Sequence, residues 1–143
     1  MGKIEKTVEF AAAPEKVWAV VADPSRFGDW LNMHKSWKGD VPTEFSKGAQ
    51  VTAVVSLLNM PNTITWTVEE YEPPRAVRLT GTGMAGVKVA ITLDVEPQGS
   101  GTAMSITAEF EGQMIVGAIG QAVEKAGRQE LDESMAKLAE LVA

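Results

Sequence analysis

The spacing of apolar residues changes along this chain, and that change limits its fold more than any other sequence feature. Between about residues 35 and 112, apolar and polar residues alternate, most clearly in 63–69, 87–95 and 104–110. Alternation of this kind is typical of half-buried strands. From Gln113 to Val142 the apolar residues recur at helical spacing instead. A sheet followed by a long C-terminal helix predicts an α+β domain.

The N-terminal part of the chain predicts one strand and two short helices. Residues 3–10 alternate, although Lys6 falls on the apolar face. Pro14 suits the first position of a helix. Asp23-Pro24 is expected to end that helix and to cap a second one, from Ser25 to about Leu31.

Short connections between the strand segments predict antiparallel neighbours, and the single apolar face predicts a sheet covered on one side. The expected turns are Met60-Pro61-Asn62, Glu72-Pro73-Pro74, Gly81 to Gly86 and Pro97 to Gly101. Together the segments give about seven strands, two short helices and the long helix in one domain, residues 1–143. One helix cannot fill a strongly twisted sheet of this size. We therefore expect an apolar cavity beneath it, closed at one end by the short helices.

Composition excludes several classes of function. The chain of 143 residues has no cysteine and a net charge of −6, from 13 basic and 19 acidic residues. This balance argues against nucleic-acid binding, and the absence of cysteine suits a reducing cytoplasm. The N-terminus has no secretory leader, and no apolar stretch approaches the roughly 18 residues of a membrane span. We expect a cytoplasmic protein with no metal site and no cofactor.

A glycine-rich segment, Gly81-Thr82-Gly83-Met84-Ala85-Gly86, matches the pattern G-x-G-x-x-G. A dinucleotide site needs a helix after these glycines, because the free amides at its N-terminus bind the pyrophosphate. Here the alternating segment Val87–Val95 follows. The pattern therefore indicates a hairpin.

His34, the only histidine, has two interpretations. Its ordinary pKa suits a general base or a polar anchor at a cavity wall. The sequence favours a second interpretation, an imidazole that caps or bridges the junction between helix and strand, because the sequence near it offers neither an orienting carboxylate nor a nucleophile.

The last helix carries two further features. Gly117, Gly120 and Gly127 weaken it, and the sequence leaves two explanations open: close packing on the sheet, or room for a ligand under a movable N-terminal half. Two pairs at i,i+4 spacing, Glu124 with Arg128 and Glu133 with Lys137, are expected on its outer face.

The order of these segments, with the stretch PEKVWAVVADPSRFGDW, resembles the START-like (SRPBCC) superfamily over essentially the whole chain. That superfamily contains polyketide cyclases, dehydrases and lipid-transport proteins with the helix-grip fold. The stretch WLNMHKSWKGDVPTEFSKGAQV, with Trp66-Thr67, Tyr71–Pro74 and Gly86–Val89, is similar to an actinobacterial subfamily. Members of that subfamily are described as toxins of type II toxin–antitoxin systems or as cyclase-like proteins.

Three hypotheses follow. The first is binding or transport of a small hydrophobic ligand, such as a lipid, polyketide or aromatic metabolite, with His34 as a polar contact. The second is a cyclase- or dehydratase-like enzyme in which His34, with Arg78, moves protons. The third, implied by the resemblance alone, is a toxin that binds an antitoxin protein. The residues expected to line the cavity are Trp30, His34, Trp37, Trp66, Val89, Ile91, Met104, Phe110, Ile119 and Val123.

Overall fold

The computed structural model describes residues 2–39, 45–57, 60–83, 86–112 and 117–142, without the side chains of Leu57 and Met60. The elements in chain order are β1 (Gly2–Phe10), α1 (Pro14–Val21), the 3₁₀ turn η1 (Pro24–Arg26), α2 (Phe27–Trp30), β2 (His34–Lys38), β3 (Gln50–Leu57), β4 (Met60–Glu72), β5 (Ala76–Thr82), β6 (Lys88–Gln98), β7 (Gly101–Glu111) and α3 (Gly117–Val142).

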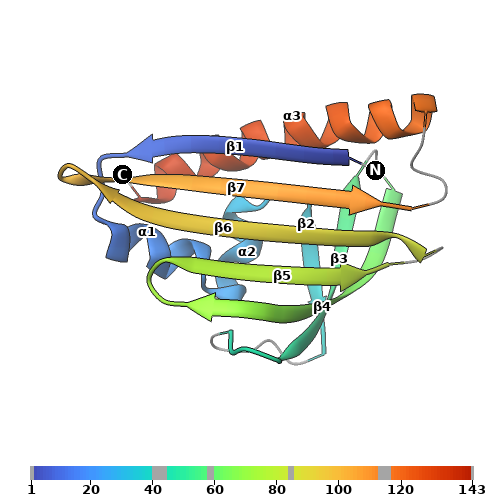
Figure 1. Cartoon of the computed structure of the whole chain (residues 1–143), viewed down its shortest axis with the longest axis horizontal. Coiled ribbons are helices and arrows are strands. Elements are labelled where there is room, and N and C mark those ends of the chain that lie inside the picture. Colours follow the sequence, from blue (N-terminus) through green and yellow to red (C-terminus); the bar gives the residue numbers. More distant parts are fainter. Residues whose placement is uncertain (1, 40–44, 58–59, 84–85, 113–116, 143) are drawn as a thin grey trace.

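The strands form one antiparallel sheet in the order β1-β7-β6-β5-β4-β3-β2. Figure 1 shows the curved sheet with α1 and α2 on one side and α3 running alongside β1 and β7. The alternation seen in the sequence sets the two faces: in β6, Ile91, Leu93 and Val95 are buried, whereas Asp94 is exposed. The predicted α+β architecture, with seven strands, two short helical segments and a long C-terminal helix, is confirmed.

The two short helical segments begin where the sequence predicts. Pro14 occupies the first turn of α1, where its missing N–H costs nothing. The Asp23 carboxylate accepts a hydrogen bond from the Ser25 amide and caps η1. The expected helix from Ser25 to about Leu31 is a 3₁₀ turn followed by the single turn α2, because Leu31 is already extended.

The prediction of a turn at Met60-Pro61-Asn62 is wrong, because these residues begin strand β4. Leu57 pairs with Met60, and Ser56 pairs with Pro61. The chain therefore reverses before Met60, and residues 58–59 lie outside the described residues. Proline and asparagine mark turns by local preference, but here the register of the two long strands determines where the chain reverses.

The glycine-rich segment joins two strands, as predicted. Thr82 ends β5 and Lys88 begins β6, while Met84 and Ala85 lie outside the described residues. Gly81 is not a turn residue but part of β5. A Cβ atom on it would lie 2.5 Å from Ile64 Cγ2 and 2.8 Å from Trp66 Cε3. Glycine is required here because two large side chains of β4 cover its backbone.

Helix α3 is described from Gly117, so residues 113–116 of the expected helix lie outside the described residues. Its buried residues are Gly127, Leu131, Ser134, Met135, Leu138 and Val142. A Cβ atom on Gly127 would lie 2.4 Å from Ile4 Cδ1, so this glycine allows close packing of α3 on β1. Lys6, whose position on the apolar face was unexpected, reaches α3 and pairs with Asp132.

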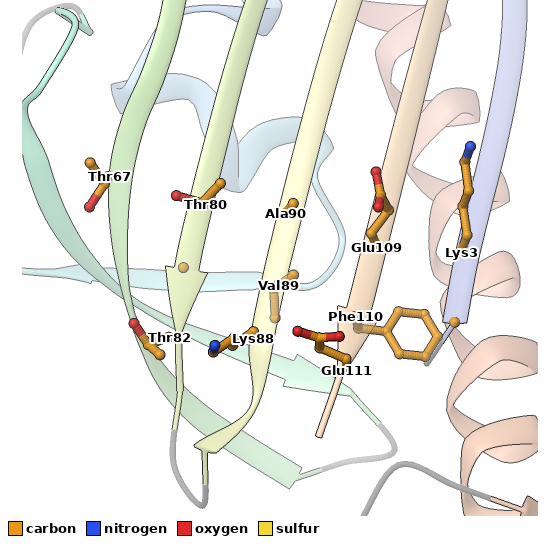
Figure 2. A pocket seen from close by; sticks show the side chains of 12 residues that line it. Lys3, Thr67, Thr80, Thr82, Lys88, Val89, Ala90, Glu109, Phe110 and Glu111 are labelled. Atoms are coloured by element: carbon orange, nitrogen blue, oxygen red, sulfur yellow. The ribbon is translucent and has the colours of Figure 1, made fainter. Parts of the chain in front are cut away.

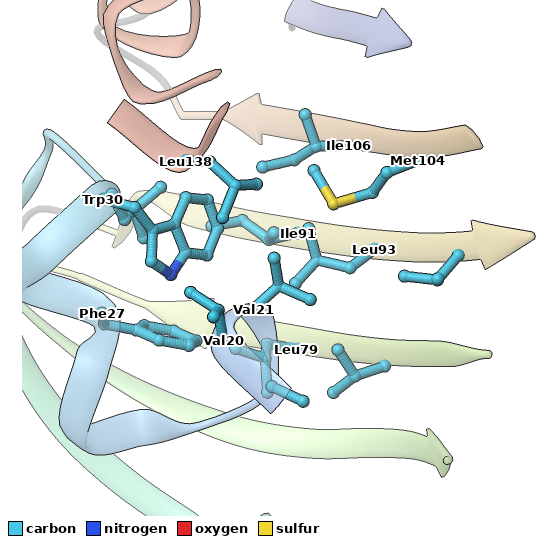
Figure 3. Packing of buried hydrophobic residues seen from close by; sticks show 14 of the residues in the cluster. Val20, Val21, Phe27, Trp30, Leu79, Ile91, Leu93, Met104, Ile106 and Leu138 are labelled. Atoms are coloured by element: carbon cyan, nitrogen blue, oxygen red, sulfur yellow. The ribbon is translucent and has the colours of Figure 1, made fainter. Parts of the chain in front are cut away.

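One apolar cluster fills the space between the sheet and the helices, with contributions from every helix and from most strands (Figure 3). None of the helices in the described part of the chain is both long and apolar enough to cross a bilayer.

Candidate functional site

An enclosed apolar cavity lies between α2 and the middle of the sheet. Its volume is about 10 Å³. Its lining comes from α2 and the residue after it, and from β5, β6 and β7: Phe27, Trp30, Leu31, Val77, Leu79, Ile91, Leu93 and Ile106. No lining side chain is charged, and the indole N–H of Trp30 is the only polar side-chain group among them. This volume is about that of one water-sized probe, so side chains fill nearly all of the space in which the sequence predicted a cavity.

Trp30 is the most unusual residue of this lining. It is 1% exposed, and its Nε1 is buried without a hydrogen-bond partner among the described residues. In Figure 3 this nitrogen lies on the edge of the indole that is drawn towards Phe27 and Val20. A buried donor without an acceptor costs about 1–3 kcal/mol. The site therefore contains an unused hydrogen-bond donor.

His34 lies beside this cavity in a group of aromatic rings. It is 8% exposed, and its ring centre lies 4.7 Å from that of Trp37 and 6.0 Å from that of Phe27. Phe27 also packs against Phe45, with a distance of 5.5 Å between ring centres. Burial lowers the pKa of His34 below its ordinary value of 6.5. The neutral imidazole is thus the favoured form in this apolar environment.

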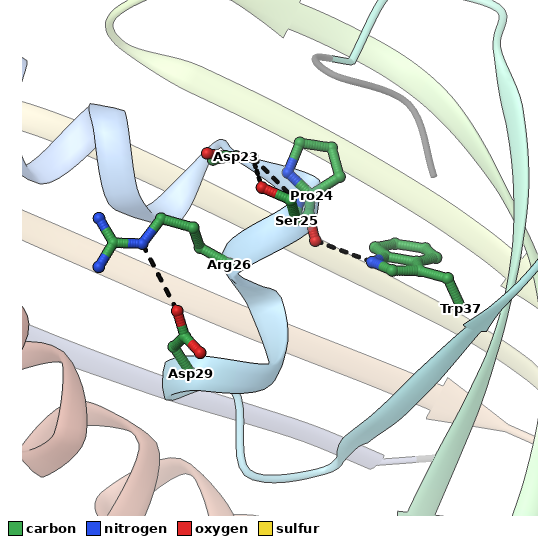
Figure 4. Close-up of polar contacts among 6 residues, drawn as sticks. All are labelled: Asp23, Pro24, Ser25, Arg26, Asp29 and Trp37. Carbon is green, nitrogen blue, oxygen red and sulfur yellow. Dashed lines mark hydrogen bonds and ion pairs between the residues drawn. The ribbon is translucent and has the colours of Figure 1, made fainter. Parts of the chain in front are cut away.

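The other tryptophans and Met104 of the expected lining lie outside the enclosed cavity. Trp37 is half-buried, and its Nε1 donates to the carbonyl of Pro24 at 2.8 Å, which ties β2 to η1 (Figure 4). Trp66 is buried over Gly81. Met104 is fully buried in the general core.

Val89 and Phe110 lie at one end of the inner face of the sheet, in a row of paired residues. Gly2 pairs with Phe110, Phe110 with Val89, and Val89 with Gly81. Val89 is half-buried, whereas Val77 and Val95, towards the opposite end of the sheet, are each 1% exposed. The apolar inner face is thus less completely covered at this end.

The N-terminal half of α3 does not bring its predicted residues to the cavity. Ile119 is 55% exposed and Val123 is half-buried, and neither borders the enclosed cavity. The expectation that Ile119 faces a cavity is therefore not met. Helical spacing gave the correct face for Leu131 and Leu138, but no residue from Gly117 to Ala126 is buried.

A larger, open hollow of about 640 Å³ lies on the sheet (Figure 2). Most of its lining residues alternate with the buried ones and so belong to the solvent-facing side: Lys3, Thr67, Thr80, Thr82, Lys88, Ala90, Glu109 and Glu111. The rest of the lining is the row of paired residues described above, Gly2, Phe110, Val89 and Gly81. We place the candidate site in the interior instead, because this outer surface is polar and open.

A polar cluster fixes the C-terminal half of α3 to the turn after α2. The backbone amide of Asn32 donates to Ser134 Oγ at 2.8 Å. Asn32 Nδ2 donates to carboxylate oxygens of Glu130 at 2.6 Å and Glu133 at 2.7 Å, and Lys137 donates to Asn32 Oδ1. Among the described residues, Glu133 and Lys137 thus meet Asn32 rather than each other. The expected pair of Glu124 and Arg128 is present.

The structure separates the two residues of the enzyme hypothesis. Arg78 lies between the buried residues Val77 and Leu79, and its guanidinium donates to Thr92 Oγ1 at 2.9 Å. It therefore faces the opposite side of the sheet from His34 and cannot share a reacting group with it. Among the described residues, no three histidine, aspartate or glutamate side chains are grouped so as to hold a metal ion.

Sequence reasoning missed part of the cavity lining. Phe27, Leu31, Val77 and Leu79 were not expected there. For Val77 and Leu79 a signal existed, because they alternate with Arg78 and Thr80. For Phe27 and Leu31 the contact depends on how α2 crosses the sheet.

The sequence matches the family described as "Polyketide cyclase / dehydrase and lipid transport" over residues 1–143. It is 31% identical to an uncharacterised protein of Mycobacterium tuberculosis over 141 residues, which cover 99% of both chains. It is 34% identical over 135 residues to "Toxin Rv0910" of the same species, with 94% of each chain covered.

Solved structures share this fold at low sequence identity. A "START superfamily protein" from Mycobacterium smegmatis has a TM-score of 0.79 and 19% identity, over 98% of this chain and 96% of that chain. A protein from Chromobacterium violaceum has a TM-score of 0.75 and 18% identity, over 98% and 96% of the two chains. With its curved seven-stranded sheet around a long C-terminal helix, the chain has the helix-grip fold, and it belongs to the polyketide cyclase/dehydrase and lipid transport family.

Proposed function

We propose that this protein binds a small apolar molecule, in the cytoplasm, between the inner face of the sheet and the helices. The observation that carries this proposal is the uneven cover of the apolar face. Val77 and Val95 are fully buried at one end, whereas Val55 and Val89 are half-buried near the other. An apolar interior with one incompletely covered end is suited to the entry of an apolar molecule.

The long helix supports this entry route. Its first ten residues, Gly117–Ala126, include no buried side chain, and in Figure 1 these turns extend past the start of β1. The later turns are held by the core and by the Asn32 cluster. Segments with few buried apolar contacts open at the lowest free energy, so the N-terminal half of α3 is the part expected to move.

The enclosed cavity, at about 10 Å³, is smaller than any apolar ligand of this class. Binding therefore requires an outward shift of α2 or of the N-terminal half of α3. The driving force would be burial of the ligand's apolar surface, about 25 cal/mol per Å², reduced by the cost of this rearrangement.

Two variants on β6 test the proposal with the uncharged dye N-phenyl-1-naphthylamine, whose fluorescence rises in apolar surroundings. Val89→Asp places a carboxylate on the inner face, and Ala90→Asp places one on the outer face of the same strand. We expect Val89→Asp to weaken dye binding at least about tenfold and Ala90→Asp to leave it unchanged, because a dye bound on the inner face would bury the Val89→Asp carboxylate without a partner, which is costly. Circular dichroism checks that both variants fold.

Both Val89 and Ala90 border the outer hollow, so weaker binding by Ala90→Asp, alone or together with Val89→Asp, would locate the dye there. That result, or no binding to the wild-type protein, would reject the proposed site. Native mass spectrometry of protein purified gently from its own host complements the titration. A small molecule that is retained natively and lost on denaturation would identify the physiological ligand class.

A second candidate function is the binding of an antitoxin protein. It is supported by the relative named as a toxin and by the exposure of Ile119, the one large apolar residue exposed in the described part of the chain. Co-purification of a host protein that Ile119→Asp abolishes, while dye binding stays intact, would favour this function.

A cyclase- or dehydratase-like activity remains a prediction, and turnover unchanged in His34→Ala would remove its only proposed base.

A further inference from the structure

The buried indole of Trp30 has no acceptor, although the fold supplies one to a nearby tryptophan. Trp37 Nε1 donates to the carbonyl of Pro24, whereas Trp30 Nε1 has no partner among the described residues. The carbonyls of Phe27 and Leu31, which are near Trp30 in the sequence, accept from the backbone amides of Leu31 and His34 and not from this indole. Most buried donors in proteins are paired, so this exception needs an explanation.

An ordered water molecule does not satisfy this group well. A buried water normally makes about three hydrogen bonds, and it needs two to four polar partners. Apart from Trp30, the side chains that line the cavity are Phe27, Leu31, Val77, Leu79, Ile91, Leu93 and Ile106. None of these offers a second hydrogen bond through its side chain. Water in this position would remain mostly unsatisfied.

The same lining restricts what else can reach Trp30. An indole N–H is a donor only, so its partner must carry an acceptor. The rest of the partner must be apolar because it would lie against aliphatic and aromatic side chains. A carboxylate or phosphate is disfavoured, since no lining residue carries a compensating positive charge.

We infer that Trp30 is the specificity-determining residue of the cavity and that the ligand is an uncharged apolar molecule with a hydrogen-bond acceptor, such as a ketone, ester or ether oxygen, which accepts from Trp30 Nε1. This inference rests on the proposed function and adds the chemical class of the ligand. It distinguishes neutral carbonyl compounds from plain hydrocarbons and from free acids.

The test compares ligands that share one skeleton. Fluorene, 9-fluorenone and fluorene-9-carboxylate differ in the group at one carbon: a hydrocarbon, a neutral acceptor and an anion. We expect the wild-type protein to bind 9-fluorenone about tenfold more tightly than fluorene, and the carboxylate more weakly than either. Affinities are measured by displacement of N-phenyl-1-naphthylamine.

Two tryptophan variants test whether the Trp30 N–H causes the preference for 9-fluorenone over fluorene. Trp30→Phe keeps an aromatic ring but removes the N–H, and we expect it to bind the ketone and the hydrocarbon equally. Trp37→Phe removes an N–H that already has an acceptor outside the cavity, so it should keep the preference of the wild-type protein. The comparison is therefore between the loss of a free donor and the loss of a paired one.

A measurement on the wild-type protein keeps the inference testable if Trp30→Phe fails to fold. The four indole N–H signals are assigned in ¹⁵N-labelled protein from single variants of the other tryptophans. The Trp30 signal should move downfield with 9-fluorenone and not with fluorene. Equal affinities with an unmoved Trp30 signal would overturn the inference but leave ligand binding in place. If neither compound binds, the proposed function fails, and this inference fails with it.

Discussion

His34 illustrates how a single polar residue is affected by its surroundings. Its imidazole lies among the rings of Trp37 and Phe27, and burial lowers its pKa. In the unfolded chain the same group has its ordinary value of 6.5. When the pH falls below 6.5, the unfolded state therefore takes up a proton before the folded state does. The contribution of His34 to stability is complete above pH 6.5 and is lost as the pH falls towards the lowered pKa.

We predict that His34→Phe removes this pH dependence while it keeps a ring in the aromatic group. Between pH 7.5 and pH 5 the melting temperature of the wild-type protein should fall relative to that of the variant, by roughly 1–4 °C. The carboxylates that titrate in the same range are common to both proteins, so the difference isolates His34. Parallel melting temperatures across this range would show that burial does not disfavour the charged imidazole.

Helix α3 consists of two halves with different environments. The C-terminal half contributes Leu131, Met135 and Leu138 to the core, whereas the first ten residues contribute no buried side chain. The polar contacts around Asn32 fall on the same C-terminal half. One half of α3 is thus fixed to the core, and the other can respond to a ligand.

Ser134 is predicted to be the main polar anchor of this half. Its Oγ accepts from the Asn32 amide and donates to the carbonyl of Glu130 at 2.7 Å, and its side chain is fully buried. Ser134→Ala would leave the Asn32 amide without this acceptor and should lower the free energy of unfolding by about 1–3 kcal/mol. Urea denaturation measures the change.

Asn32→Ala is the matched control, because it removes only the side-chain contacts and keeps the hydrogen bond from the backbone amide of residue 32 to Ser134 Oγ. Its contacts with Glu133 and Lys137 are exposed, so we expect a loss of less than about 1 kcal/mol. A larger loss for Asn32→Ala than for Ser134→Ala would contradict this assignment of the anchor.

At the scale of the whole molecule, one apolar cluster connects the sheet with all of the helices. Trp30 from α2, Ile106 from β7 and Leu138 from α3 all belong to it. Because no separate second core is present among the described residues, the domain should unfold in a single cooperative transition.

The pair Leu138→Ala and Leu141→Ala tests this view. Leu138 is fully buried, whereas Leu141 lies on the same helix and is half-buried. We expect Leu138→Ala to cost about 2–5 kcal/mol and to lower the single melting transition as a whole. The cost of Leu141→Ala should be clearly smaller. Two separate transitions in the Leu138→Ala variant would mean that α3 and the sheet unfold independently.

Much of the fold could be predicted because alternation and helical spacing are local signals. They identified the strands, the buried face of β6 and the helix that carries Leu131 and Leu138. The candidate site was harder to predict. Of the ten residues expected in the lining, Trp30 and Ile91 border the enclosed cavity. Whether any of the ten binds a ligand stays a prediction.

The sequence by itself determined the order of the elements and which face of each strand is apolar, because both depend on neighbours within a few residues. Tertiary structure decided the rest. It placed the reversal between β3 and β4 before Pro61, left Ile119 outside the core and brought Asn32 to Ser134. It also enclosed the Trp30 indole without an acceptor. These outcomes depend on strand register and on how segments far apart in the chain cross, which no local pattern of residues specifies.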